Sequence, residues 1–210
     1  MKKTEFQLER MILFSDAVFA IAITLLVIEI KVPHIERQIN DDSILHSLIH
    51  ILPELLGFIL SFFTIGIYWS VHHRIFGTVE NYDIKLIWIN MTFLFSIVLM
   101  PFTTAVYSHF YQPNVIIPHL IYTINICLTG VLTIILISYT NNPAYSLKSK
   151  YDSKGSVTIQ NMRALMMPLV LVFGLLISAF TLPWIGRMSP LLIPVYLFCV
   201  NKLTNSNSSR

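Results

Sequence analysis

The feature that most constrains this chain is a series of apolar blocks of about 20 residues each, separated by short polar segments. A block of this length forms a helix that crosses the hydrocarbon core of a bilayer. Charge content points the same way, because 12% of the residues are charged, whereas a soluble domain is about a quarter charged. The chain is therefore expected to be an all-α integral membrane protein.

Six blocks predict six transmembrane helices within one domain, residues 1–210. The first block contains Asp16 and is too long for the apolar core of a signal peptide, so we expect it to be a retained helix. Pro53 is a candidate kink in the second block, and Pro194 interrupts the last. The predicted helices cover residues 11–30, 46–70, 84–107, 116–138, 161–181 and 188–201.

The distribution of Lys and Arg predicts the orientation. With six spans, Lys31, Arg37 and Arg187 lie on one side of the membrane and the 11 remaining Lys and Arg residues lie on the other. Cytoplasmic loops carry the excess of positive residues, so both termini are expected in the cytoplasm, in a multi-pass plasma-membrane protein. The net charge of +3 reflects this topology, and no basic cluster with interleaved aromatics indicates a nucleic-acid partner.

Ionisable residues inside a membrane helix are costly and are functional candidates by default. The first block contains Asp16 and Glu29, and Arg10 lies at its start. At about 100° per residue, Arg10 and Asp16 lie about 240° apart around a helix, so they cannot pair on one face. We therefore expect their partners on other helices.

Candidate partners stand at the ends of the second and third blocks, which the topology brings to the inner leaflet. The second block ends Y-W-S-V-H-H-R from Tyr68, and the third begins W-I-N from Trp88. An alternative is that the first helix is capped locally, with Trp69 an interfacial anchor and the histidines in a loop. The favoured prediction is a polar network among Arg10, Phe14, Ser15, Asp16, Trp69, His72, His73 and Asn90.

Beyond Asp16 the first block is apolar on every face. Ile21, Thr24 or Leu25, and Ile28 recur at spacings of three and four and form one stripe. Such a stripe is by default a core or lipid contact, so periodicity alone assigns it no function.

The same block resembles the opening of a known family. The motif R-x-x-x-F-S-D from Arg10, followed by A-V-F-A-I-A-I-T-L-L-V, is similar to the endolysosomal potassium channel family (transmembrane protein one-seven-five), especially its bacterial single-repeat members. The segments Y-W-x-x-H-H-R-x-F from Tyr68 and W-x-N from Trp88 extend the resemblance. The second half of the chain matches only in helix count and hydropathy.

The resemblance implies a homotetrameric leak channel, modestly selective for potassium over sodium, in which the first helix of each subunit lines the pore. It implies apolar constriction rings from Ile21, Leu25 and Ile28, and a hydroxyl layer from Thr24. Ile28 stands where a Leu is common in relatives, which keeps the layer apolar but changes its width. The network around Asp16 is implied to hold the helices together.

Physical arguments agree with this cation channel fold without a P-loop selectivity filter. The T-V-G-Y-G loop of conventional potassium channels is absent from the chain. A hydrophobic constriction instead gates by dewetting and penalises sodium, the more strongly hydrated ion. Glu29, near the outer mouth, either concentrates cations there or extends to the interface.

The main alternative is a secondary transporter or a proton pathway, in which Asp16, His72 and His73 form a relay. An enzyme is disfavoured, because the chain contains no H-E-x-x-H motif, phosphate loop or Gly-rich nucleotide motif. A purely structural subunit is a further alternative. No cofactor or resident metal is expected; the expected partners are permeant potassium ions, the lipid bilayer and other copies of the chain.

Overall fold

The computed structural model describes residues 3–33, 39–110, 112, 115–148 and 157–180, and the regular structure there is helical. The expected last span, residues 188–201, lies outside the described residues. The helices are α1 (Lys3–Ile28), α2 (Asp41–His50), α3 (Leu52–Phe76), α4 (Ile84–Val98), α5 (Met100–His109), α6 (Ile117–Thr140), the short 3-10 helix η1 (Pro143–Tyr145) and α7 (Val157–Phe180).

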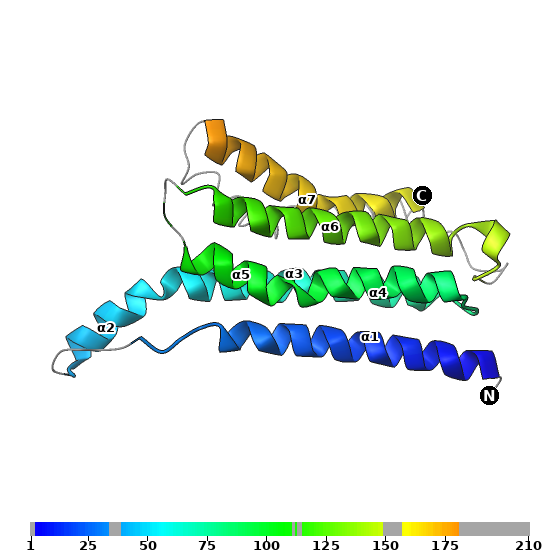
Figure 1. The fold of residues 1–210 in the computed structure, drawn as a ribbon, viewed down its shortest axis with the longest axis horizontal. Helices are drawn as coiled ribbons and strands as arrows, with labels where there is room; N and C mark the ends of the chain where they lie inside the picture. The colour runs from blue at the N-terminus through cyan, green and yellow to red at the C-terminus, as the bar shows by residue number, and fades with distance from the viewer. Residues whose placement is uncertain (1–2, 34–38, 111, 113–114, 149–156, 181–210) are drawn as a thin grey trace, which may run out of the picture.

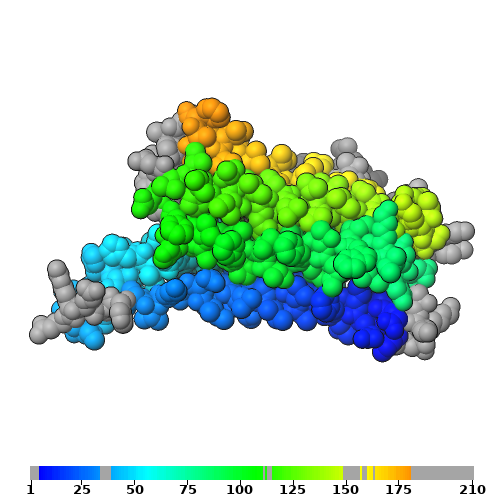
Figure 2. Space-filling model, in the orientation of Figure 1, coloured from blue at the N-terminus to red at the C-terminus, as the bar shows by residue number. Residues whose placement is uncertain are grey.

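Five segments in this part of the chain are long and apolar enough to cross a membrane: α1, α3, α4 together with α5, α6, and α7. Figure 1 shows these helices side by side, with α1 at one edge of the bundle and α7 at the opposite edge. The contacts agree, because α1 packs against α3, α4 and α5, while α6 lies between those helices and α7. The result is an elongated body with α1 along its side (Figure 2).

The single helix expected for residues 46–70 is instead two helices. Helix α2 begins earlier, after Asn40, whose side chain accepts from the Ser43 amide while the Ser43 hydroxyl accepts from the Asn40 amide. This capping box fixes the start of α2. Pro53 lies in the first turn of α3, where its missing N–H is not needed, so it begins a helix rather than kinking one.

The helix expected for residues 84–107 is likewise divided, at Leu99, into α4 and α5. Pro101 explains the break, because it cannot donate to the carbonyl of Ile97 and its ring crowds that turn. The Asn125 side chain of α6 donates to the Ser96 carbonyl beside the break, at 3.2 Å. A polar side chain from a neighbouring helix thus supports the irregular backbone, as membrane helices require.

Hydroxyl groups link helices in the bundle interior. Thr104 of α5 donates to the Ser61 hydroxyl of α3 at 2.7 Å, and Ser61 lies 3.1 Å from the Tyr122 hydroxyl of α6. All three residues are buried. In lipid, where helix association gains little from the hydrophobic effect, such hydrogen bonds and close packing hold helices together.

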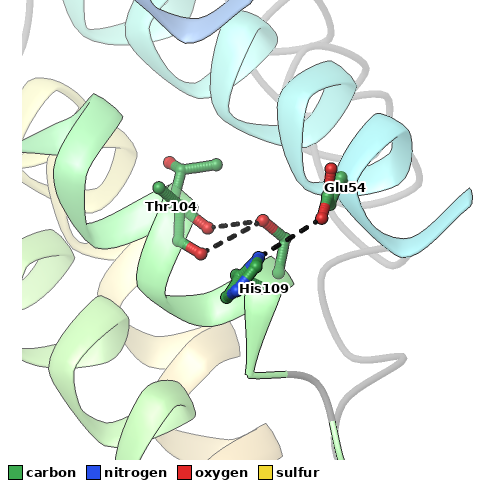
Figure 3. Close-up of polar contacts among 5 residues, drawn as sticks. Glu54, Thr104 and His109 are labelled. Carbon is green, nitrogen blue, oxygen red and sulfur yellow. Dashed lines mark hydrogen bonds and ion pairs between the residues drawn. The ribbon is translucent and has the colours of Figure 1, made fainter. Parts of the chain in front are cut away.

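The two ends of the bundle differ in charge. Arg10, Arg74, Lys85 and Lys148 lie at the end that holds the start of α1; of the Lys and Arg side chains that the structure describes, Lys31 alone lies at the other end. That other end holds the start of α3 and the end of α5, which are linked where the His109 Nδ1 lies 3.5 Å from the Glu54 carboxylate (Figure 3).

Candidate functional site

Helix α1 contacts the bundle through one narrow face. Ser15, Phe19, Ala22 and Leu26 recur at spacings of three and four and are each at most 1% exposed. These spacings place all four side chains on one side of a helix. The rest of α1 is largely uncovered. In its most apolar stretch of 18 residues 22% is buried, against 39–56% in the corresponding stretches of the other candidate spans.

A buried chain of hydrogen bonds joins α1 to α3 and α4. The His72 Nε2 lies 2.9 Å from the Asn90 Oδ1, and the Asn90 amide donates to the Ser15 hydroxyl at 2.9 Å. Ser15 in turn donates to the carbonyl of Met11 at 2.9 Å. His72, Asn90 and Ser15 are each at most 1% exposed. Three helices are therefore joined by bonds that water does not reach.

The hydrogen bond to Asn90 determines which ring nitrogen of His72 carries the hydrogen. Because the Asn90 oxygen faces the ring, Nε2 must carry the hydrogen and donate it. The Nδ1 atom is buried and has no hydrogen-bond partner among the described residues. Phe19, Phe76 and Phe93 surround the ring, with centroids 5.5, 4.4 and 5.6 Å away. His72 thus donates from Nε2 and packs within an aromatic shell.

A second, outward-facing contact joins α1 to α3. The Trp69 indole N–H donates to the Asp16 carboxylate at 2.9 Å, and the Trp69 ring stacks on His73 with centroids 5.6 Å apart. Asp16 is half-buried, whereas Trp69 and His73 are exposed. Within the described chain no hydrogen bond connects this contact to His72, so Asp16 and His72 do not form a continuous relay there.

Two residues of the expected network lie apart from it. Arg10 is exposed, its guanidinium lies 5.9 Å from the centre of the Phe6 ring, and it forms no ion pair with another described residue. Phe14 is 49% exposed. Sequence reasoning missed Phe19, which contacts both His72 and Phe93; its spacing of four from Ser15 was the available signal.

The apolar stripe of α1 lies on its uncovered side. Ile21, Leu25 and Ile28 are 58%, 39% and 69% exposed. Thr24 is exposed too, and its hydroxyl donates to the carbonyls of its own helix at Ala20 and Ile21. At about 100° per residue, this stripe points away from the buried face of α1. Glu29, also exposed, follows the end of the helix.

Within the described residues, no group of three or more His, Cys, Asp or Glu side chains is arranged to hold a metal ion. The described side chains of α1 form helix-joining hydrogen bonds on one face and an uncovered apolar stripe on the other.

Comparison with known proteins shows which family the first half of the chain resembles. Residues 10–101 match the family model of the endosomal/lysosomal potassium channel TMEM175. The resemblance of the first helix to the TMEM175 family is confirmed. The match begins within α1 and includes α2, α3 and α4, so it contains the parts of α1, α3 and α4 that the buried hydrogen bonds join.

Named relatives agree with the family. A potassium channel of Chryseobacterium sp. (strain P1-3) is 44% identical over 101 residues, which are 47% of this chain and 49% of that relative. The endosomal/lysosomal proton channel TMEM175 of Danio rerio is 40% identical over 73 residues, 32% of this chain and 14% of that relative. These names describe channels rather than enzymes, and the matches span half of the relatives' length or less.

The fold comparison extends further along the chain. The crystal structure of a lysosomal potassium-selective channel TMEM175 homolog from Chamaesiphon minutus matches with a TM-score of 0.75 and 25% identity. The match covers 93% of this chain and 98% of that structure. This TMEM175 homolog therefore shares the helical bundle well beyond the segment of close sequence similarity.

Proposed function

We propose that this protein is a potassium channel in which four copies of the chain surround a pore lined by α1. The uncovered apolar stripe of α1 carries the proposal. A helix held on one side by buried hydrogen bonds, and uncovered on the other, suits a position at the centre of an assembly. The names of the bacterial relatives support potassium as the permeant ion.

Lipid is the competing environment for the stripe, because Ile and Leu side chains also face acyl chains. Two observations favour the pore. The stripe contains Thr24, whose hydroxyl lies between apolar layers. The exposed carboxylate of Glu29 follows the C-terminal end of the stripe. In a tetramer, four Glu29 side chains would attract cations to the outer mouth.

The proposed constriction consists of rings formed by Ile21, Leu25 and Ile28. Apolar rings gate by dewetting, and an ion that passes must lose part of its hydration shell. Sodium holds water more strongly than potassium, so the constriction discriminates modestly in favour of potassium. Thr24 supplies a hydroxyl layer between the rings formed by Ile21 and Leu25.

The full topology that we propose has six spans with both termini in the cytoplasm of a cell whose plasma membrane holds the channel. The described part contributes five candidate spans, and residues 188–201 would supply the sixth. The basic residues at the end of the bundle that holds the start of α1 support the orientation. On this topology the hydrogen bonds of His72, Asn90 and Ser15 lie toward the inner leaflet, and Glu29 lies outside.

Proton conduction is a second candidate, because the animal relative is named a proton channel. A relay through Asp16, His72 and His73 would need connected donors and acceptors. Asp16 bonds Trp69 and His72 bonds Asn90 in separate contacts. We therefore favour a structural role for both, and a proton current would have to follow the pore itself.

Cysteine accessibility tests the lining of the pore. Leu25→Cys would be made in a chain whose two cysteines, Cys127 and Cys199, are replaced by Ala, and potassium flux would be measured with a charged thiol reagent. Leu128→Cys on α6 is the matched control, since Leu128 is also 39% exposed. We expect the reagent to block flux in the Leu25 variant alone. Equal insensitivity of both variants, with the thiols shown to be intact, would exclude Leu25 from the pore.

A further inference from the structure

Helix α2 lies outside the bundle and is not used by the proposed pore. Figure 1 shows it diverging from the other helices at the end opposite the start of α1. It has no buried residue. His46 and His50 stand four residues apart on it, with ring centroids 4.6 Å apart, and both are exposed.

Two histidines four residues apart on a helix present their rings on the same face, one turn from each other. This is the ligand spacing that helical zinc motifs use. Neutral imidazole nitrogen binds Zn²⁺, Ni²⁺ and Cu²⁺, whereas Mg²⁺ and Ca²⁺ prefer oxygen. The contact between the two rings shows that the side chains already share one side of α2.

The helix holds the pair in position. Both halves of the capping box between Asn40 and Ser43 fix its first turn, and the Ser47 hydroxyl donates to the Ser43 carbonyl at 2.8 Å. Neither ring is buried, so both can rotate their nitrogens toward a shared ion without displacing a neighbour. A preordered pair loses less entropy on binding.

The remainder of α2 keeps the histidines in water. At about 100° per residue, Ile44, Leu45, Leu48 and Ile49 form one face of the helix, the histidines lie on the opposite side, and Asp42 lies at the border between them. The apolar side chains are 38–60% exposed. An amphipathic helix of this kind rests on a membrane surface with its polar face outward. The Asp42 carboxylate, one turn before His46, adds negative charge beside that residue.

We propose that His46 and His50 form a bidentate site for a divalent transition-metal ion such as Zn²⁺ or Ni²⁺, with water completing the coordination. No third His, Cys, Asp or Glu joins the pair within the described residues, so the ion is held by two protein ligands and remains exchangeable. The site does not depend on channel activity.

Binding of Ni²⁺ to the purified, tag-free full chain in detergent tests the site, measured by calorimetry. We expect one ion per chain at neutral pH and weaker binding as the imidazoles protonate. His46→Ala and His50→Ala should each weaken binding by more than about tenfold, because the second ligand binds intramolecularly only in the pair. Mg²⁺ should show no comparable binding.

Two controls separate the pair from other histidines. His109→Ala removes an exposed histidine beside Glu54 (Figure 3) and should leave binding unchanged. Combining Ser47→His with His50→Ala keeps the histidine count but sets the rings on adjacent residues, and binding should be lost. Wild-type affinity in that variant, or in both single His→Ala variants, would overturn the proposal. All variants alter exposed or half-exposed side chains, and gel filtration would verify their assembly.

Discussion

The Asn90 side chain of α4 forms hydrogen bonds to both α3 and α1. It accepts from His72 and donates to Ser15 through the two ends of one amide. An ionised Asp could accept but not donate, and Leu could do neither, so neither side chain would make both bonds. The contact also explains why polar residues stand inside otherwise apolar spans: each bond satisfies a group that lipid would leave without a partner.

Replacing Asn90 with Ala should therefore destabilise the protein. We expect a loss of about 1–3 kcal/mol, because the variant leaves the His72 donor and the Ser15 hydroxyl buried without their partner. Thermal unfolding of the detergent-solubilised protein measures this. Thr92→Ala, an exposed site on the same helix, should change stability little. Equal stability of the Asn90 variant and wild type would contradict a structural role for the contact.

Asp16 has a different environment, because its contact with Trp69 is at the surface of the single chain. We expect Asp16→Ala to impair folding or assembly more than ion preference, since it removes a charge-assisted hydrogen bond between α1 and α3. Trp69→Phe removes the same bond and should have the same effect. Expression, oligomer size and permeability ratio would be measured together. A well-assembled Asp16 variant with altered ion preference would contradict this assignment.

To predict these contacts, one must know which side of each helix faces the bundle. The sequence selects polar residues on α1, α3 and α4, but α1 is apolar all round beyond Asp16, so periodicity could not tell which side faces the bundle. Only packing decides that Ser15 turns inward while Phe14 turns outward. For the same reason the sequence could not separate Arg10 from the residues that join helices.

At the scale of the elements, α6 and α7 approach each other closely at Gly130. A Cβ on Gly130 would lie 2.4 Å from the Pro168 Cγ and 3.2 Å from the Ala164 carbonyl. Pro168 lies inside α7, where its ring bulges toward the neighbour. Glycine is therefore required at this crossing, which allows the backbones to pack closely.

Gly130→Ala should destabilise the packing of α6 on α7 by about 1–3 kcal/mol, because a methyl group has no space there. Gly66→Ala is the matched control: no atom lies within 4 Å of its added Cβ, and removing a helix-interior glycine should be neutral or favourable by about 0.5–1 kcal/mol. Thermal unfolding of both variants gives the comparison. Equal midpoints for the two would contradict the close approach of α6 and α7.

The ends of the helices could not all be predicted from the apolar blocks of the sequence. Uninterrupted hydropathy merged α4 with α5 and the end of α2 with α3, although the capping pair Asn40 and Ser43 was readable in advance. Pro53 and Pro101 each lie in the first turn of a helix, α3 and α5 respectively. Whether such a proline kinks a helix or starts one depends on the backbone before it, which hydropathy does not report.

At the scale of the whole molecule, the described helices pack into one bundle and leave one side of α1 uncovered. Its polar groups join helices, its apolar side chains fill the bundle, and the stripe of Ile21, Leu25 and Ile28 lies uncovered on α1. We therefore propose that function arises between copies of the chain and that four stripes together form the path of the ion.

Potassium flux into liposomes containing the purified protein, compared with sodium flux, tests this claim most directly. Leu25→Asn and its control Leu128→Asn would be measured beside wild type. We expect potassium-preferring flux in wild type, a reduced preference in the Leu25 variant because a polar ring wets the constriction, and an unchanged preference in the Leu128 variant. Absence of flux in wild type, or the same permeability ratio in all three proteins, would contradict it.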